Sequence, residues 1–217
     1  MCGIAGLISH KVNHLENVNK IITKLSHRGP DNNGIWQSDD KTITFGHTRL
    51  SILDLSSAGN QPMISSCGRY VLTYNGEIYN HLSLRKKIEA KRKQQFQWKG
   101  SSDTETLLES FVEFGVKNTL EKVIGMFAFG LWDAKHKKLI LGRDRLGEKP
   151  LYYGWVNDSF VFASELKAIK AIGGFQNKIC QKSLSLYMQL MYMPTPYSIY
   201  SNIYKLHPGA LLIANQD

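Results

Sequence analysis

The second residue of the chain is a cysteine, within the opening stretch Met1-Cys2-Gly3-Ile4-Ala5-Gly6. Removal of Met1 would leave Cys2 with a thiol and a free α-amine, which ordinarily titrate near ~8.5 and near ~7.7–8.0. A thiol nucleophile and an amine base on one residue can attack a carbonyl carbon without a histidine partner. The other interpretation is a small apolar residue that begins a strand over 2–8. Position alone favours the strand, so the remainder of the chain must decide.

The segments that would position Cys2 are strands and helices in separate runs. Residues 3–9 are apolar, with two glycines that allow another segment to approach closely, so we predict a buried strand. Further apolar segments predict strands at 42–48, 69–74, 126–132, 138–142, 151–155, 160–163 and 210–214. Apolar residues at helical spacing predict helices at 14–26, 81–91, 103–115, 117–124, 165–172 and 183–193. Strands in runs with helices between them favour an α+β architecture of stacked layers.

Three short motifs admit a purely structural interpretation. Asn75-Gly76 follows a predicted strand and, taken alone, is typical of a hairpin turn. Ser102-Asp103-Thr104-Glu105 predicts a capping box at the start of the helix over 103–115, where the helix dipole alone would explain Asp103. Arg49 stands at the end of a predicted strand, and such a residue commonly forms a surface ion pair of little energetic value.

The composition is that of a globular protein, with 42% hydrophobic and 21% charged residues among 217. No apolar run approaches the ~20 residues of a membrane span and no leader-like segment opens the chain, so we expect a cytoplasmic protein without membrane contact. Cys2, Cys67 and Cys180 are too scattered for a disulfide framework, and no metal motif is present. The net charge of +9 gathers in Arg85-Lys86-Lys87, Lys91-Arg92-Lys93 and Lys135-His136-Lys137-Lys138. Without a recognition motif these clusters indicate a solvated helix face and a hairpin tip, and we expect no nucleic-acid binding.

Several motifs, each weak alone, follow one another in a single order along nearly the whole chain. After the opening stretch come His27-Arg28-Gly29-Pro30-Asp31, Gly46-His47-Thr48-Arg49-Leu50-Ser51-Ile52, Gln61-Pro62-Met63, Tyr74-Asn75-Gly76-Glu77-Ile78-Tyr79-Asn80, Ser102-Asp103-Thr104-Glu105, Gly125-Met126-Phe127-Ala128-Phe129, Arg143-Asp144-Arg145-Leu146-Gly147-Glu148-Lys149-Pro150-Leu151-Tyr152-Tyr153 and Ser164-Glu165-Leu166-Lys167-Ala168. In this order they resemble the class II glutamine amidotransferase domain, which begins with a cysteine. More narrowly, the chain resembles the amino-terminal half of glutamine-hydrolysing asparagine synthetase. His207 departs from that family, which more often has proline there.

The resemblance implies a fold and a division of the chain. We expect a four-layer αββα sandwich of the N-terminal nucleophile hydrolase type, with mostly antiparallel sheets. Residues 1–182 would form the glutaminase domain, and 183–217 a connector helix and strand leading towards an ATP-dependent synthetase domain. ATP and Mg would belong to that absent domain, because its Ser-Gly-Gly-x-Asp-Ser loop has only Gly173-Gly174-Phe175 as a poor counterpart here. This chain would need no cofactor and no metal.

The resemblance also implies a role for individual residues. Cys2 would attack the side-chain amide of L-glutamine and form a thioester, while its amine carries the thiol proton to the departing ammonia. The oxyanion would be held by the Asn75 side chain and the Gly76 N–H. Substrate contacts would come from Arg49 on the α-carboxylate, from Asp103 and Glu77 on the α-ammonium, and from Leu50 and Ile52, although apolar packing would also explain Ile52. Arg28 and Gly29 would shape a loop over the pocket.

Three functions remain open at this point. The first is glutamine hydrolysis that supplies ammonia for amidation of aspartate by a carboxy-terminal synthetase domain or subunit. The second is a glutamine-binding or docking module without turnover, whose apolar residues 187–192 would contact that partner. The third is the amidotransferase half for another acceptor, such as a sugar acid. A homodimer is compatible with each of them.

Overall fold

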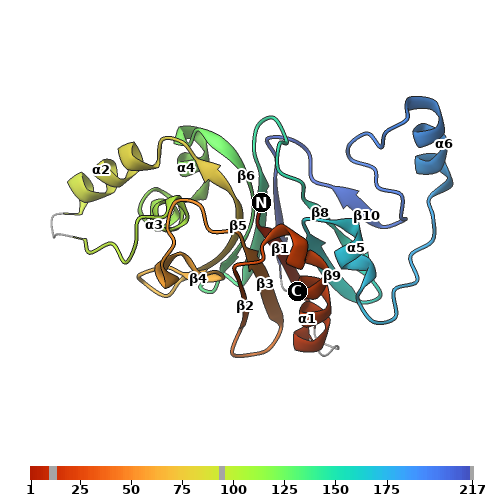
Figure 1. Cartoon of the computed structure of the whole chain (residues 1–217), viewed down its shortest axis with the longest axis horizontal. Helices are drawn as coiled ribbons and strands as arrows, with labels where there is room; N and C mark the ends of the chain where they lie inside the picture. Colours follow the sequence, from red (N-terminus) through yellow and green to blue (C-terminus); the bar gives the residue numbers. More distant parts are fainter. Residues whose placement is uncertain (10–13, 93–95, 216–217) are drawn as a thin grey trace.

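The computed structural model describes residues 1–9, 14–92 and 96–215; Lys93, in one of the basic clusters, lies outside them. Two antiparallel sheets pack face to face (Figure 1). In spatial order, the first sheet contains β10 (Ile203–Lys205), β8 (Tyr152–Val156), β9 (Ser159–Ala163), β1 (Gly3–Ile8), β3 (Ile43–Arg49) and β2 (Asn32–Gln37). The second contains β11 (Leu211–Asn215), β7 (Lys138–Arg143), β6 (Gly125–Asp133), β5 (Tyr70–Ile78) and β4 (Met63–Ile64).

Helices cover the outer face of each sheet. The first sheet is covered by α1 (His14–Leu25) and α5 (Leu166–Lys170), and the second by α2 (His81–Lys91), α3 (Asp103–Phe114) and α4 (Val116–Lys122). Two single-turn 3₁₀ helices, η1 (Ser26–Arg28) and η2 (Ser57–Gly59), lie in loops. The last helix, α6 (Gln181–Leu190), stands at the end of the molecule, on the right in Figure 1. This order of layers confirms the predicted αββα sandwich.

One of the aromatic side chains in the core between the sheets, Phe162, lies beside β1. Phe162 packs edge-on against Phe45, with ring centroids 5.6 Å apart. A Cβ atom on Gly6 would lie 2.3 Å from the Phe162 ring, and one on Gly130 of the facing sheet would lie 2.4 Å from it. The glycine in β1 therefore makes room for a ring that joins the two sheets.

The alternation of side chains along β1 indicates where the side chain of Cys2, the residue just before the strand, points. Ile4 and Ile8 belong to the core between the sheets, whereas Ala5 and Leu7 pack under the helices of the first sheet. Side chains alternate along a strand, so Cys2 faces the same way as Ile4. The nucleophile candidate therefore points towards the second sheet.

Two polar contacts also cross between the sheets. Thr73 Oγ1 donates to Gly46 O (3.2 Å), and the His47 ring lies 3.1 Å through its Nε2 from Tyr74 O. A carbonyl oxygen can only accept, so Nε2 of His47 carries the proton. Burial lowers the pKa of His47 to about 4, and the ring is neutral at physiological pH.

The strands β2, β4 and β10 are absent from the sequence prediction, and β5 is longer than predicted. Asn32, Asn33 and Gly34 in β2 have low strand propensity, but they pair with β3, and β2 ends its sheet. Strand β5 continues to Ile78, with Asn75 opposite Ala128 and Gly76 opposite Phe127. The hairpin-turn interpretation of Asn75-Gly76 is therefore wrong.

Within the described residues, none of the helices combines the length and the apolar character that a membrane span requires. The hairpin tip predicted around Lys135 to Lys138 is confirmed, because β6 ends at Asp133 and β7 begins at Lys138.

The packing around Phe162 generates a stability prediction. We expect Gly6→Ala to lower the free energy of unfolding by about 1–3 kcal/mol, because the methyl group would force the ring out of its place. The nearest atom to a Cβ on Gly173 is 3.5 Å away, so Gly173→Ala is the control and should stay within about 0.5 kcal/mol. Urea unfolding measures both. Equal stability of Gly6→Ala and the wild type would contradict the packing role.

The buried His47 generates a pH-dependent prediction. In the unfolded chain His47 takes up a proton near pH 6.5, whereas in the folded protein it does so only near pH 4. The contribution of His47 to the free energy of unfolding is therefore lost as the pH falls between those values. Between about pH 7 and about pH 5 the wild type should lose about 2 kcal/mol through this residue. His47→Gln retains an N–H donor and should lack this loss, whereas His207→Gln, at an exposed position, should retain it. Urea unfolding at both pH values gives the answer, and an unchanged pH dependence in His47→Gln would contradict the assignment.

Candidate active site

A cavity of about 130 Å³ opens beside Cys2, where the end of β1 meets the edge of β5. Its wall contains every residue predicted for catalysis and substrate contact: Cys2, Arg49, Leu50, Ile52, Asn75, Gly76, Glu77 and Asp103. Residues far apart in the sequence thus converge on one site. Arg28 and Gly29 do not line this cavity.

The Cys2 sulfur is held by the backbone of Leu50. Leu50 N donates to Sγ at 3.4 Å, and Sγ donates to Leu50 O at 3.6 Å. Burial raises the pKa of the Cys2 thiol, against the opposing effects of the Leu50 N–H and of nearby positive charges. A thiol of this kind needs a base in order to react at neutral pH.

Arg28 and Gly29 hold the backbone around the nucleophile. Arg28 donates through Nε to Cys2 O (2.9 Å) and through Nη1 to Glu165 (2.8 Å). A Cβ on Gly29 would lie 2.4 Å from the carbonyl of Thr48, so only glycine lets this loop pack against β3. Their positions fit anchoring of the chain next to Cys2 rather than a cover over the pocket.

Asn75 presents an unpaired donor in the cavity. Its side chain shares a strand face with Thr73, which contacts the first sheet, so the amide points towards the side where Cys2 lies. Asn75 is only 2% exposed, and its Nδ2 has no hydrogen-bond partner among the described residues. An unpaired buried donor costs about 1–3 kcal/mol. Such a donor, in the wall that contains a nucleophile, is suited to an oxyanion.

The backbone of Gly76 points the same way by strand geometry. Phe127 donates through N to Asp144 Oδ2 (3.2 Å) and accepts at O from Asp144 N (2.8 Å), so both groups face away from β5. Gly76 is the register partner of Phe127, and paired residues of an antiparallel ladder either exchange bonds or both point outward. The Gly76 N–H therefore points away from β6, towards the edge of β5 that β4 leaves uncovered.

The neighbours of Gly76 along this edge are both bonded to side chains. Tyr74 N donates to Gln61 Oε1 (2.7 Å), and Ile78 N donates to Asp103 Oδ2 (2.8 Å). A Cβ on Gly76 would lie 2.3 Å from Met126 O, which excludes any larger residue without a shift of the strands. The Gly76 N–H thus points into the cavity, between the Tyr74 and Ile78 N–H groups, which are both hydrogen-bonded.

Arg49 is almost buried, so its interpretation as a surface ion pair is wrong. The residue is 7% exposed, and its Nη1 donates to Ser56 O and to Asn60 Oδ1, each at 2.8 Å, while Nη2 donates to Asp54 O. Three of the five N–H donors of a guanidinium are engaged in this way. The loop over 54–60 therefore fixes the position of this cation in the cavity wall.

Asp103 lies in the same cavity wall as Arg49 and carries the opposite charge. Its Oδ2 accepts from the Tyr74 hydroxyl (2.9 Å) as well as from Ile78 N. Burial raises the pKa of Asp103, while these two donors oppose the shift. Ser102 caps α3 by accepting from Glu105 N (3.2 Å), so the predicted helix start is confirmed. Asp103 serves both the helix start and the pocket.

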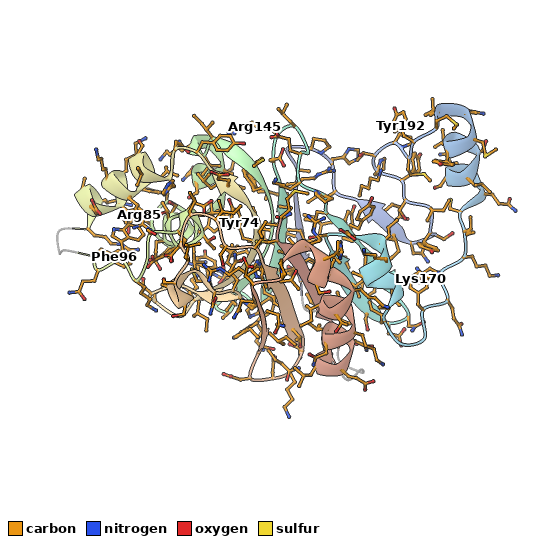
Figure 2. All side chains as sticks on the ribbon, viewed as in Figure 1. Tyr74, Arg85, Phe96, Arg145, Lys170 and Tyr192 are labelled. Carbon is orange, nitrogen blue, oxygen red and sulfur yellow. The ribbon has the colours of Figure 1, made fainter. Side chains whose placement is uncertain are left out.

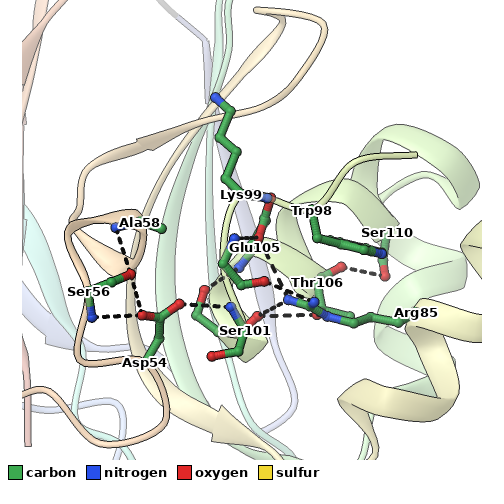
Figure 3. Close-up of polar contacts among 12 residues, drawn as sticks. Asp54, Ser56, Ala58, Arg85, Trp98, Lys99, Ser101, Glu105, Thr106 and Ser110 are labelled. Carbon is green, nitrogen blue, oxygen red and sulfur yellow. Dashed lines mark hydrogen bonds and ion pairs between the residues drawn. The ribbon is translucent and has the colours of Figure 1, made fainter. Parts of the chain in front are cut away.

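Asp54, which the sequence did not single out, and Glu105, predicted only as part of a capping box, brace the loops beside the cavity (Figure 3). Asp54 accepts from Ser56 N and from Ser101 N, both at 2.8 Å, and the Ser56 hydroxyl lowers the pKa of Asp54 to about 2. Glu105 accepts from the backbone of Lys99 (2.8 Å) and Gly100 (3.0 Å) instead of closing the capping box.

Arg85 belongs to the same brace. It stacks on Trp98 at 4.1 Å and donates to Gly100 O and Ser102 O, each at 3.0 Å. The prediction that the cluster at Arg85 is simply a solvated helix face is wrong for this residue. Nothing in its sequence neighbourhood distinguishes it from the exposed Lys86 and Lys87.

Ile52 and Glu77 are on the accessible part of the wall. Ile52 is 66% exposed, which contradicts the alternative that it serves mainly in apolar packing. Lys149 and Gln61 also line the cavity, although the sequence marked neither as a site residue. Lys149 belongs to the family motif over 143–153, but its residue type and spacing alone point to no role in the site.

Known proteins share the sequence pattern and the fold of this chain. The sequence matches the glutamine amidotransferase domain family over residues 1–217. The whole chain aligns at 37% identity with a putative glutamine-hydrolysing asparagine synthetase of Methanocaldococcus jannaschii, and at 35% with asparagine synthetase 3 of Bacillus subtilis, covering 44% and 35% of their lengths. Among solved structures, the fold resembles glutamine phosphoribosylpyrophosphate amidotransferase from B. subtilis, with a TM-score of 0.67, 25% identity, and coverage of 79% of this chain and 44% of that one. The chain spans less than half the length of these relatives, and it belongs to the glutamine amidotransferase domain family.

Proposed function

We propose that the chain hydrolyses L-glutamine to L-glutamate and ammonia, with Cys2 as the nucleophile once Met1 has been removed. The observation that carries this proposal is the unpaired, buried Asn75 amide in the cavity that also contains the Cys2 sulfur. The wall further contains one guanidinium, Arg49, and three carboxylates. Asp54 accepts from Ser56 N and Ser101 N, whereas Glu77 and Asp103, together with Arg49, complement an amino acid zwitterion.

The reaction follows from the chemistry of these groups. The Cys2 amine takes the thiol proton while Sγ bonds to the amide carbon of glutamine, and the oxyanion accepts hydrogen bonds from Asn75 Nδ2 and Gly76 N. The C–N bond then breaks, the proton passes from the amine to the leaving ammonia, and a thioester remains. Water attacks the thioester carbon with the same amine as base, which releases glutamate and restores the thiol.

We further propose that the ammonia serves ATP-dependent amidation of aspartate in a synthetase domain or subunit. The Methanocaldococcus and Bacillus relatives aligned above are named as asparagine synthetases, the first as a putative one, and both are more than twice as long as the matched segment, which leaves room for that second activity. ATP and Mg would be bound there. Another acceptor, such as a sugar acid, would use the same glutaminase site.

Helix α6 supplies a surface that such a partner would cover. Only Ser183 is buried in this helix, whereas Met188 is 70% exposed and Met191, just after it, is 76% exposed. Figure 2 shows Tyr192 at the end of the molecule opposite Arg85 and Phe96. Contiguous exposed apolar side chains mark interaction surfaces. The boundary at residue 182 between glutaminase and connector stays a prediction; the strands β10 and β11 beyond it extend the two sheets.

The nucleophile assignment has a direct test. Cys2→Ala should abolish glutamate release, because Cys67 and Cys180 do not line the cavity, and Cys2→Ser should reduce it severely. Glutamate is measured by a coupled assay, with intact mass to show whether Met1 is absent. Equal rates for Cys2→Ala and the wild type, or full activity of protein that retains Met1, would contradict the mechanism. Glutamine binding by calorimetry without glutamate release from the wild type would favour the non-catalytic module.

The oxyanion role predicts a separation of activity from stability. Asn75→Ala should lower kcat about 10²–10³-fold with little change in KM, because it removes one oxyanion donor. Its melting temperature should not fall, since the lost Nδ2 group is unpaired in the folded protein.

Asn80 is the matched control for this prediction. Its side chain donates to Lys122 O and accepts from Ile124 N, each at 2.9 Å. Asn80→Ala should therefore lose stability and keep kcat. If Asn75→Ala instead melted earlier and retained kcat, its amide would be structural.

A further inference from the structure

Lys149 carries a nearly buried ammonium into the wall of the candidate active site. The residue is 7% exposed and lines the cavity together with Met1 and Cys2. Its Nζ donates to Met1 Sδ at 3.4 Å. A thioether is a weak acceptor, so this contact does little to compensate the charge.

The backbone around Lys149 is fixed on both sides. Lys149 N donates to Asp144 Oδ2 (3.0 Å), and Lys149 O accepts from Arg143 Nε (2.7 Å). The same Asp144 carboxylate accepts from Phe127 N, directly opposite Gly76 in the ladder. The backbone of Lys149 is therefore connected through Asp144 to β6, next to Gly76 of β5.

Removal of Met1 changes what this ammonium faces. The Met1 thioether is lost, and the nitrogen of the former peptide bond between Met1 and Cys2 becomes the α-amine of Cys2. We propose that Lys149 is a positioning residue for this amine: its positive charge favours the uncharged form of the amine, which is the form that accepts the thiol proton. This inference rests on the proposed glutamine hydrolysis.

Other charged groups act on the same amine and remain in place in every variant below. The charged groups of the cavity wall or of the segments beside it are Arg28, Arg49, Asp54, Glu77, Asp103, Asp144 and Glu148, and the Cys2 thiol and the Tyr74 hydroxyl are titratable. Arg28 bonds to the Cys2 carbonyl, and Arg49, Asp54, Tyr74, Glu77 and Asp103 come from the facing cavity wall. A difference between variants at position 149 therefore reports Lys149 itself.

The test is the pH dependence of kcat/KM for glutamine hydrolysis by the wild type, Lys149→Met and Lys149→Arg. Each protein is produced with a leader that a site-specific protease removes to leave Cys2 first, because Lys149 contacts Met1 and a substitution could alter its removal. Lys149→Met should raise the apparent pKa of the acid limb by about one unit, which lowers activity about tenfold on that limb and little on the plateau. Lys149→Arg should restore the wild-type profile. Lys170→Met, at an exposed lysine, is the control and should match the wild type.

Two kinetic results would overturn the proposal. One is an acid limb in Lys149→Met that coincides with the wild type, and the other is a rise in KM alone, which would make Lys149 a substrate ligand. An isotope-edited NMR titration of the Cys2 amine in the wild type and in Lys149→Met provides the same comparison without turnover. Absence of glutamate release from the wild type would refute the proposed hydrolysis, whereas equal amine titrations in the two proteins would refute the role of Lys149.

Discussion

Each backbone N–H along the uncovered edge of β5 requires an acceptor, because a buried donor without one is costly. Strand β4 pairs with β5 at Val71 and Leu72, and among the described residues the rest of that edge has no strand partner. Gln61 and Asp103 take up the N–H groups of Tyr74 and Ile78. The Gly76 N–H, which lies between them, points into the cavity. The site exists because β5 extends beyond the end of β4. The loops and α3 are arranged around the backbone N–H donors of β5 that β4 does not pair.

Internal arginines support this arrangement through carbonyl oxygens more than through carboxylates. Arg49 binds the loop over 54–60, and Arg143 donates to Lys149 O and Leu206 O, each at 2.7 Å. The exposed Arg145 uses carbonyl oxygens in the same way, donating to Val123 O and Leu120 O, each at 2.8 Å. A guanidinium suits this use because its donors lie in a fixed plane. Part of the net charge of +9 is thus structural, which explains a basic chain without a nucleic-acid motif.

The strongly periodic parts of the fold could be predicted from the sequence, and the edges could not. Buried strands such as β1 and β6 are apolar on both faces, so their composition alone identifies them. Strand β2 is polar and depends on its pairing with β3, a long-range contact that no local pattern encodes. Asn75-Gly76 has the residues of a turn, and its inclusion in β5 is decided by the facing strand. The residues of the candidate site came from the family resemblance, whereas the bracing by Arg85 and the exposure of Ile52 required the three-dimensional structure.

The place of Met1 in the cavity wall has a consequence for how this protein matures. The sheets, the anchored loops and the unpaired Asn75 amide are already present with Met1 attached. A single peptide-bond cleavage would then turn a folded, latent precursor into a competent catalyst, with no refolding step. Specific activity would accordingly report the fraction of molecules that have lost Met1. If the protein were produced faster than the cellular aminopeptidase removes Met1, the preparation would be a mixture of inactive and active molecules.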